Sequence, residues 1–159
     1  MKPYIGPPLA GLLLILHVGN ANAQKVDRYS TEGLKAQGMA LRSKLDAATG
    51  SYLQVLEKYP NHLSMLILRE RDGQAELHEK TADVIFVVDG NAELWTGGEM
   101  KDAKQTEEGE RRGSGLTGGT ATTLRKGDIV HIPANVPHQV HIATGGTFTY
   151  FVLKVREEK

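Results

Sequence analysis

The segment GDIVHIPANVPHQV, residues Gly127 to Val140, decides the fold of this chain. Its pattern predicts a turn, a short apolar strand, a turn around Pro133, and a histidine, His138, that begins another strand. Upstream, the segment AELHEKTADVIFVVDG, Ala75 to Gly90, places a second histidine and two carboxylates around a similar bend. Two strand pairs that each carry a histidine indicate a β-barrel with a ligand or metal site in its mouth.

The first residues have the pattern of a secretory signal peptide. Lys2 precedes a short apolar run, Leu9 to Val18, and the small residues Ala21-Asn22-Ala23 follow it. The run is shorter than the ~20 apolar residues that a membrane-spanning helix needs. We therefore expect a signal peptide over 1–23, a periplasmic or secreted protein, and no membrane contact after cleavage. A buried N-terminal helix is the alternative.

Composition excludes several classes of protein. The 159 residues contain 19 Lys and Arg against 19 Asp and Glu, so no overall field favours nucleic acid or an anionic membrane. The chain has no cysteine, which excludes disulfides, thiolate metal ligands and a cysteine nucleophile. The expected partner is a small-molecule ligand or substrate.

The hydrophobic pattern divides the rest of the chain into a helical extension, 24–50, and a β domain, 51–159. Apolar residues at helical spacing predict an amphipathic helix from Ser30 to Ala48, with Ser30 or Thr31 as N-cap and Gly50 as its stop. The predicted strands are 52–57, 64–70, 75–78, 84–88, 92–95, 122–124, 128–132, 138–142 and 147–155. Turn signals at short intervals between them predict an all-β sandwich or barrel. The polar segment from Gly97 to Gly119 predicts a long solvated loop, which can also act as a lid.

The candidate site follows from strand alternation. Glu76 and His78 share one face of their strand, because side chains at i and i+2 point the same way. Asp83 begins the next strand, which antiparallel pairing would bring back beside His78. If the barrel joins the two segments, His78 and His138 converge with one or both carboxylates. Two imidazoles and a carboxylate are the ligand set of non-haem iron sites, and they also suit manganese, nickel or zinc.

The two segments resemble the two motifs of the cupin superfamily, the small double-sheet barrels among the jelly-roll folds. The first motif reads H-x-H, three or four residues, E, six residues, G; here four residues separate His78 from Asp83, and six separate Asp83 from Gly90. The second reads G, five residues, P-x-G, two residues, H. The residues at those positions are Gly127, Pro133, Asn135 and His138. The resemblance implies an all-β double-stranded β-helix, a cupin barrel, after the N-terminal helix.

The first motif departs from the family pattern in two places. Glu76 replaces the first histidine and Asp83 replaces the glutamate, so the ligand set that the resemblance implies is Glu76, His78, Asp83 and His138. Two imidazoles with two carboxylates favour one harder divalent ion such as Mn or Fe, with Ni or Zn also possible. A shorter Asp83 that does not reach the ion would leave a three-ligand site. Asn135, in place of a glycine, tolerates positive φ.

The sequence leaves two functions open. The first is an exported, divalent-metal-dependent enzyme of the oxygenase, isomerase or lyase type, with Glu76 or Asp83 as general base. The second is a periplasmic binding protein for a sugar or organic acid that holds no metal, in which histidine and carboxylate only hydrogen-bond to each other, or Glu76 lies on the surface of an edge strand.

The sequence also predicts the positions of the other histidines and the oligomeric state. His141 should face away from His138; His62 is expected in a loop, His131 in a structural role, and His17 in the signal segment. The strands VIFVV (84–88) and FTYFVLKV (148–155) are apolar on both faces, so the helix or a second subunit should cover them. Since related cupins are often dimers, we expect a homodimer.

Overall fold

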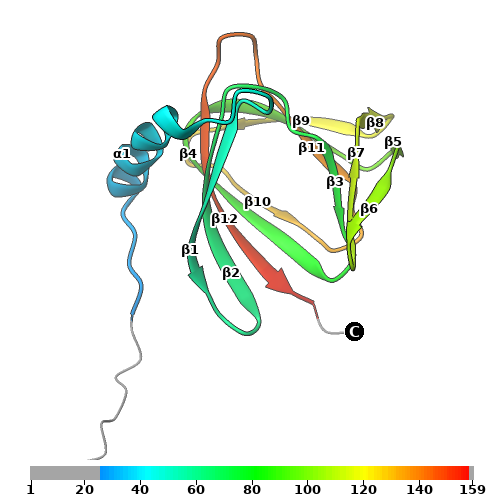
Figure 1. The fold of residues 1–159 in the computed structure, drawn as a ribbon, viewed down its shortest axis with the longest axis horizontal. Helices are drawn as coiled ribbons and strands as arrows, with labels where there is room; N and C mark the ends of the chain where they lie inside the picture. The colour runs from blue at the N-terminus through cyan, green and yellow to red at the C-terminus, as the bar shows by residue number, and fades with distance from the viewer. Residues whose placement is uncertain (1–25, 158–159) are drawn as a thin grey trace, which may run out of the picture.

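The computed structural model describes residues 26–157. The predicted signal peptide, 1–23, and His17 lie outside them. One helix precedes a curled antiparallel sheet that closes most of a barrel (Figure 1). The elements are α1 (Thr31–Leu41), the 3-10 turn η1 (Arg42–Lys44), β1 (Ser51–Lys58), β2 (His62–Arg69), β3 (Ala75–His78), β4 (Thr81–Thr96), β5 (Glu99–Lys101), β6 (Lys104–Glu107), β7 (Glu110–Gly113), β8 (Gly115–Thr117), β9 (Thr120–Arg125), β10 (Ile129–Ile132), β11 (His138–His141) and β12 (Phe148–Arg156). The prediction of a jelly-roll barrel after a helix is confirmed.

Strand β4 joins the two layers of the barrel. Its first half pairs with β12 and β10, and its second half pairs with β9 and β11. The sequence predicted two strands here, 84–88 and 92–95, with a turn signal at Asp89-Gly90 between them, and the division into two strands was wrong. The chain bends at Gly90, which has a φ of +81°, and continues as one strand. A Cβ on Gly90 would lie 2.0 Å from the carbonyl oxygen of Thr147 on the neighbouring chain segment, so only glycine fits the bend.

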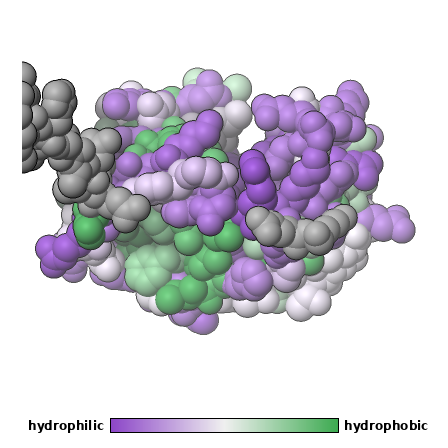
Figure 2. All heavy atoms as spheres, turned by 90° about the horizontal axis from the view of Figure 1, so that it is seen from below, coloured by the Kyte–Doolittle hydropathy of each residue, from purple (hydrophilic) through white to green (hydrophobic). Residues whose placement is uncertain are grey.

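The sheet order is β1-β2-β12-β4-β11-β3-β7-β6, with β9 and β10 added on β4, and β5 and β8 form a separate pair. Seen from below, hydrophobic residues show in the middle of the face, beside a strongly hydrophilic surface where β6 and β7 lie (Figure 2). Inward side chains of both layers form the core inside the barrel: Met65, Ile67, Ile85, Val87, Leu94, Phe148, Tyr150 and Val152 with their neighbours.

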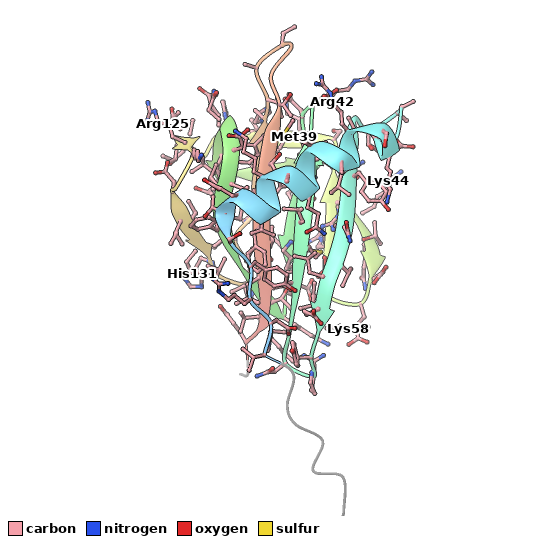
Figure 3. All side chains as sticks on the ribbon, turned by 90° about the vertical axis from the view of Figure 1, so that its left-hand side faces the viewer. Met39, Arg42, Lys44, Lys58, Arg125 and His131 are labelled. Atoms are coloured by element: carbon pink, nitrogen blue, oxygen red, sulfur yellow. The ribbon has the colours of Figure 1, made fainter. Side chains whose placement is uncertain are left out.

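Helix α1 covers the outer face of the barrel wall. Figure 3 shows the helix lying across the sheet. Leu34 and Leu41 pack there on Leu66, Leu68 and Val88, and this contact explains why the second face of these strands is also apolar. Ser30, one of the two predicted N-cap residues, is the N-cap, and its Oγ accepts a hydrogen bond from the backbone N–H of Gly33.

The helix ends earlier than the sequence predicted. It stops at Leu41 rather than Ala48, and η1 follows. The carboxylate of Asp46 accepts hydrogen bonds from the backbone N–H groups of Ala48 and Thr49. Such a side-chain turn competes with helical bonding, and it turns the chain toward β1.

The segment from Gly97 to Gly119 is not the long loop that the sequence predicted. It contains four short strands, β5 to β8, and β7 pairs with β3 along the whole of that strand. β6 and β7 are polar on both faces, and β5 and β8 each carry a single large apolar residue, Met100 and Leu116, so hydrophobic periodicity gives no signal for these strands. The pairing brings charged residues of this segment against the candidate site.

Candidate metal centre

Strand pairing brings the predicted site residues together. Glu76 on β3 lies directly opposite His138 on β11. His78 and Asp83 stand on either side of the tight turn between β3 and β4. The two motifs are also joined through the backbone, because the N–H of Asn135 donates to the carbonyl oxygen of His78 at 2.7 Å. Asn135 has a φ of +65°, the conformation for which the family pattern has glycine.

The polar atoms of the site lie within a few ångströms of one another. One ligand atom each from Glu76, His78 and His138 forms a group whose members all lie within 4.8 Å. Nε2 of His78 is 3.5 Å from Oε2 of Glu76 and 3.4 Å from Oδ2 of Asp83. Nε2 of His138 is 3.7 Å from the same Asp83 oxygen. Asp83 therefore reaches both imidazoles despite its short side chain.

Both imidazoles form a hydrogen bond through Nδ1 and direct Nε2 toward the carboxylates of the site. The Nδ1–H of His78 donates to Oε2 of Glu110 at 2.6 Å, and that of His138 donates to the carbonyl oxygen of Val136 at 3.0 Å. Both rings are buried, and Nε2 of His78 has no hydrogen-bond partner among the described residues. Metal-binding histidines typically have such a partner on the far nitrogen.

Burial and neighbouring charges act against each other on the site's pKa values. Burial would lower the pKa of His78, but the carboxylates of Asp83 and Glu76 outweigh it and raise that pKa to about 9. Burial would raise the pKa of Glu76, but His78 and Arg112 lower it to about 2. The pKa of Asp83 is also lowered, against its burial, by His78 and Lys154. Burial lowers the pKa of His138, so its imidazole is neutral at neutral pH.

Three basic side chains adjoin the carboxylates. Nζ of Lys154 donates to Oδ1 of Asp83 at 2.9 Å. Nη1 of Arg112 is 3.4 Å from Oε2 of Glu76, and Nη2 of Arg69 is 3.9 Å from Oε1 of Glu76. Each carboxylate thus faces an imidazole on one side and a cation on the other.

The donor set fits a divalent ion. Ligand atoms about 2.1 Å from a metal stand roughly 3.0 to 3.4 Å apart in octahedral or tetrahedral sites. The separations of 3.4, 3.5 and 3.7 Å between imidazole nitrogens and carboxylate oxygens are close to that range. Nε2 of His78 is buried and makes no hydrogen bond of normal geometry with the described residues, so an ion that displaced its proton would give this nitrogen a partner.

Sequence reasoning missed the residues around this set: Arg69, Glu110, Arg112, Tyr150 and Lys154. Arg69 and Lys154 did leave a signal, since each continues the inward-facing alternation of an apolar strand: Met65, Ile67, Arg69 and Tyr150, Val152, Lys154. Glu110 and Arg112 lie opposite His78 and Glu76 in the β3–β7 register, and no hydrophobic pattern in β7 reveals that pairing.

The other described histidines lie away from this centre. His141 is half-buried and hydrogen-bonded to Asp72 at 3.0 Å. His131 is exposed on β10, at the edge of the molecule in Figure 3. His62 was expected in a loop, but it begins β2, where it is half-buried and stacks on Tyr59; it plays no part in the centre.

The double-sheet topology and the histidine-bearing turn at β11 define the cupin fold, and this chain has that fold. It is similar to TT1209 from Thermus thermophilus, with a TM-score of 0.54, 13% identity, and coverage of 76% of this chain and 95% of that one. It is also similar to a cupin-2 domain, Rru_A2000 from Rhodospirillum rubrum, with a TM-score of 0.51, 13% identity, and coverage of 70% and 63%. Pac13, described as a unique nucleoside dehydratase, gives a TM-score of 0.50 at 13% identity, covering 70% of this chain and 73% of that one.

The sequence matches no family model and no curated protein. At such low identity, the structural likeness establishes the fold, and function has to be argued from the site. Within residues 26–157, no helix is long and apolar enough to cross a membrane.

Proposed function

We propose that this protein is a cupin enzyme that acts on a small molecule and uses one divalent metal ion. Glu76, His78 and His138 would hold the ion, with Asp83 beside them. The observation that carries the proposal is the pair of imidazoles whose Nε2 atoms face the same carboxylates while their Nδ1 atoms are held elsewhere. An enzyme among the proteins of similar fold, the dehydratase Pac13, supports it.

A bound divalent ion would supply Lewis-acid catalysis. The chain's own residues provide the rest. Apolar side chains such as Ile67, Ile85 and Val152 line the cavity beside the centre and limit water there. Glu76 and Asp83 are ionised at neutral pH because their pKa values are lowered, so both would present negatively charged oxygens to an ion or to a bound substrate. Lys154 adjoins Asp83 in the cavity wall and stabilises its charge.

A pair of histidine variants tests the centre. In His138→Ala, a proposed ligand is lost, and we expect bound Mn, Fe, Ni or Zn to fall at least tenfold. His141→Ala is the matched control, because it lies on the same strand but bonds to Asp72 outside the group. Metal content should be measured by elemental analysis on protein purified without chelators or metal-affinity resin. Equal metal content in the two variants would refute the assignment.

The second candidate is a non-catalytic binding protein for a small molecule. The observation in its favour is that Arg112 and Lys154 already pair with the carboxylates of Glu76 and Asp83, because these cations neutralise the negative charge that would attract a metal ion. A screen for thermal shift and turnover separates the two functions. Ligands that stabilise the metal-free protein without product would support binding alone, and a metal-dependent product would exclude it.

We also propose export, on the pattern of residues 1–23. N-terminal sequencing of the protein from a cell that produces it should then begin at Gln24, with the protein outside the cytoplasm. An intact Met1 on cytoplasmic protein would contradict export.

A further inference from the structure

The cavity beside the candidate centre is small, and it has one apolar wall and one polar, charged wall. Its volume is about 220 Å³, below the roughly 300–1,000 Å³ of sites for drug-sized ligands. One wall is apolar: Leu53, Met65, Ile67, Ile85, Val140 and Val152. A molecule with a short apolar part and one polar group matches this shape.

Basic side chains outnumber acidic ones in the polar wall. The basic ones are Arg69, Arg112 and Lys154, and the acidic ones are Glu76 and Asp83. Glu110 lies behind the wall, where it is hydrogen-bonded to His78. The cavity therefore has an excess of positive charge in a poorly solvated space, which attracts an anion.

Arg69 and Tyr150 offer hydrogen-bond donors on the floor of this cavity. Nε of Arg69 donates to the phenol oxygen of Tyr150 at 2.9 Å, and the Arg69 side chain makes no other hydrogen bond among the described residues. Its nearest carboxylate oxygen, on Glu76, is 3.9 Å from Nη2, beyond hydrogen-bond distance. The phenol accepts that bond, so its own proton remains available for a ligand.

The guanidinium of Arg112, which also lines the cavity, has N–H groups without a short hydrogen bond among the described residues. Its Nη1 lies 3.4 Å from Glu76 and 3.5 Å from Glu110, and its one hydrogen bond among the described residues goes to a backbone carbonyl at 3.5 Å. Planar guanidinium groups bind carboxylates through two parallel N–H bonds. Two such groups with free donors at one cavity are therefore suited to a planar anion.

We infer that the molecule bound in this cavity is a small carboxylate, with its carboxylate on Arg69 and Tyr150 and its apolar part against Ile67, Ile85 and Val152. This inference rests on the proposed function, because the carboxylate would occupy the cavity beside the proposed metal centre. It adds the chemical class of the substrate. A single planar anion matches the modest charge excess and the small volume better than a phosphate, which is larger and more highly charged.

Two acids and their neutral amides test the inference: benzoate against benzamide, and 3-methylbutanoate against 3-methylbutanamide, with inorganic phosphate alongside. Binding is measured by calorimetry or NMR titration to chelator-treated protein, and again after zinc loading. We expect at least one acid to bind about tenfold or more tightly than its amide, a preference of about 1.4 kcal/mol. Acid binding to the chelator-treated protein tests the carboxylate inference without a metal. Zinc titration of the same sample tests the metal proposal separately.

Variants test which residues cause the preference for the acid over its amide. Arg69→Gln should abolish it and Tyr150→Phe should reduce it, while Arg125→Gln, on β9 outside the cavity, should leave it unchanged. If circular dichroism shows that Arg69→Gln does not fold, Arg69→Lys replaces it, because lysine keeps the positive charge. We expect the preference of Arg69→Lys for the acid to lie between that of wild type and no preference. The inference is overturned if acids and amides bind equally, if neither acid binds, if phosphate binds more tightly than both, or if Arg69→Gln keeps the preference.

Discussion

At the scale of single residues, Glu110 holds the imidazole ring of His78 in its orientation toward Glu76 and Asp83. Its carboxylate accepts the Nδ1–H of a ring that is otherwise enclosed, and this leaves Nε2 directed at Glu76 and Asp83. The pair resembles the carboxylate–histidine arrangement behind many bound metals. Glu110 therefore supports the candidate centre without touching the point where an ion would lie.

Replacement of this partner should weaken metal binding. Glu110→Gln removes the charge that fixes the ring, and we expect zinc affinity to fall about 10- to 100-fold in a competition titration. Glu108→Gln is the control, because Glu108 is exposed and pairs only with Lys80 in the described structure. Equal affinities in both variants would show that Glu110 has no such role.

The raised pKa of His78 predicts how stability depends on pH in the metal-free protein. The folded protein holds the His78 proton up to about pH 9, whereas the ordinary pKa of a histidine is 6.5. The stabilisation is therefore complete below about pH 6.5 and is lost as the pH rises through 9. Between about pH 6.5 and 9.5, wild type should lose up to about 3 kcal/mol of unfolding free energy relative to His78→Gln, at about 1.36 kcal/mol per pKa unit. Urea unfolding of both proteins at the two pH values measures this, and parallel pH profiles would contradict it.

The sequence predicted the identity of the central residues better than their surroundings. His78, Asp83 and His138 could be placed because motif spacing and strand alternation are local. Strand alternation indicates that Arg69 and Lys154 face inward, but it does not place them or Arg112 beside Glu76 and Asp83, because that depends on which distant strands pair and in which register. That register is fixed by packing of the whole barrel.

At the scale of elements, the bend at Gly90 lets one strand serve both layers. The sequence signal Asp89-Gly90 was read as a turn between two strands, but a turn and a bend inside one strand both use a glycine with positive φ, and here the chain bends within β4. The short polar strands β5 to β8 were missed for the opposite reason, because they have no apolar alternation to read.

A pair of glycine variants tests the bend. Gly90→Ala brings a methyl group against the carbonyl oxygen of Thr147 in addition to the strain of positive φ, and we expect a loss of about 3 kcal/mol or more in urea unfolding. Gly127→Ala has a φ of +92° but no atom within 4 Å of the new Cβ, so it should lose only about 1 kcal/mol. Similar losses in both variants would mean that the close contact at Gly90 contributes nothing.

At the scale of the whole molecule, the curled sheet leaves β1 as an edge strand, and α1 covers only part of the outer surface. Leu53 and Val55 on the edge strand β1 remain half exposed, at 48% and 50%. Edge strands with apolar side chains favour association. We therefore keep the prediction of a homodimer, which light scattering at micromolar concentration would detect as twice the chain mass; a monomer mass would contradict it.

Our central claim is that the imidazoles of His78 and His138, together with Glu76, hold a metal ion. The most direct test is the metal content of wild-type protein, purified without chelators or metal-affinity resin, combined with thermal unfolding after addition of Mn, Fe, Ni or Zn. We predict close to one divalent ion per chain, or a clear rise in the unfolding temperature when one of these ions is added. Protein that contains no metal and unfolds at the same temperature with every ion would contradict the claim.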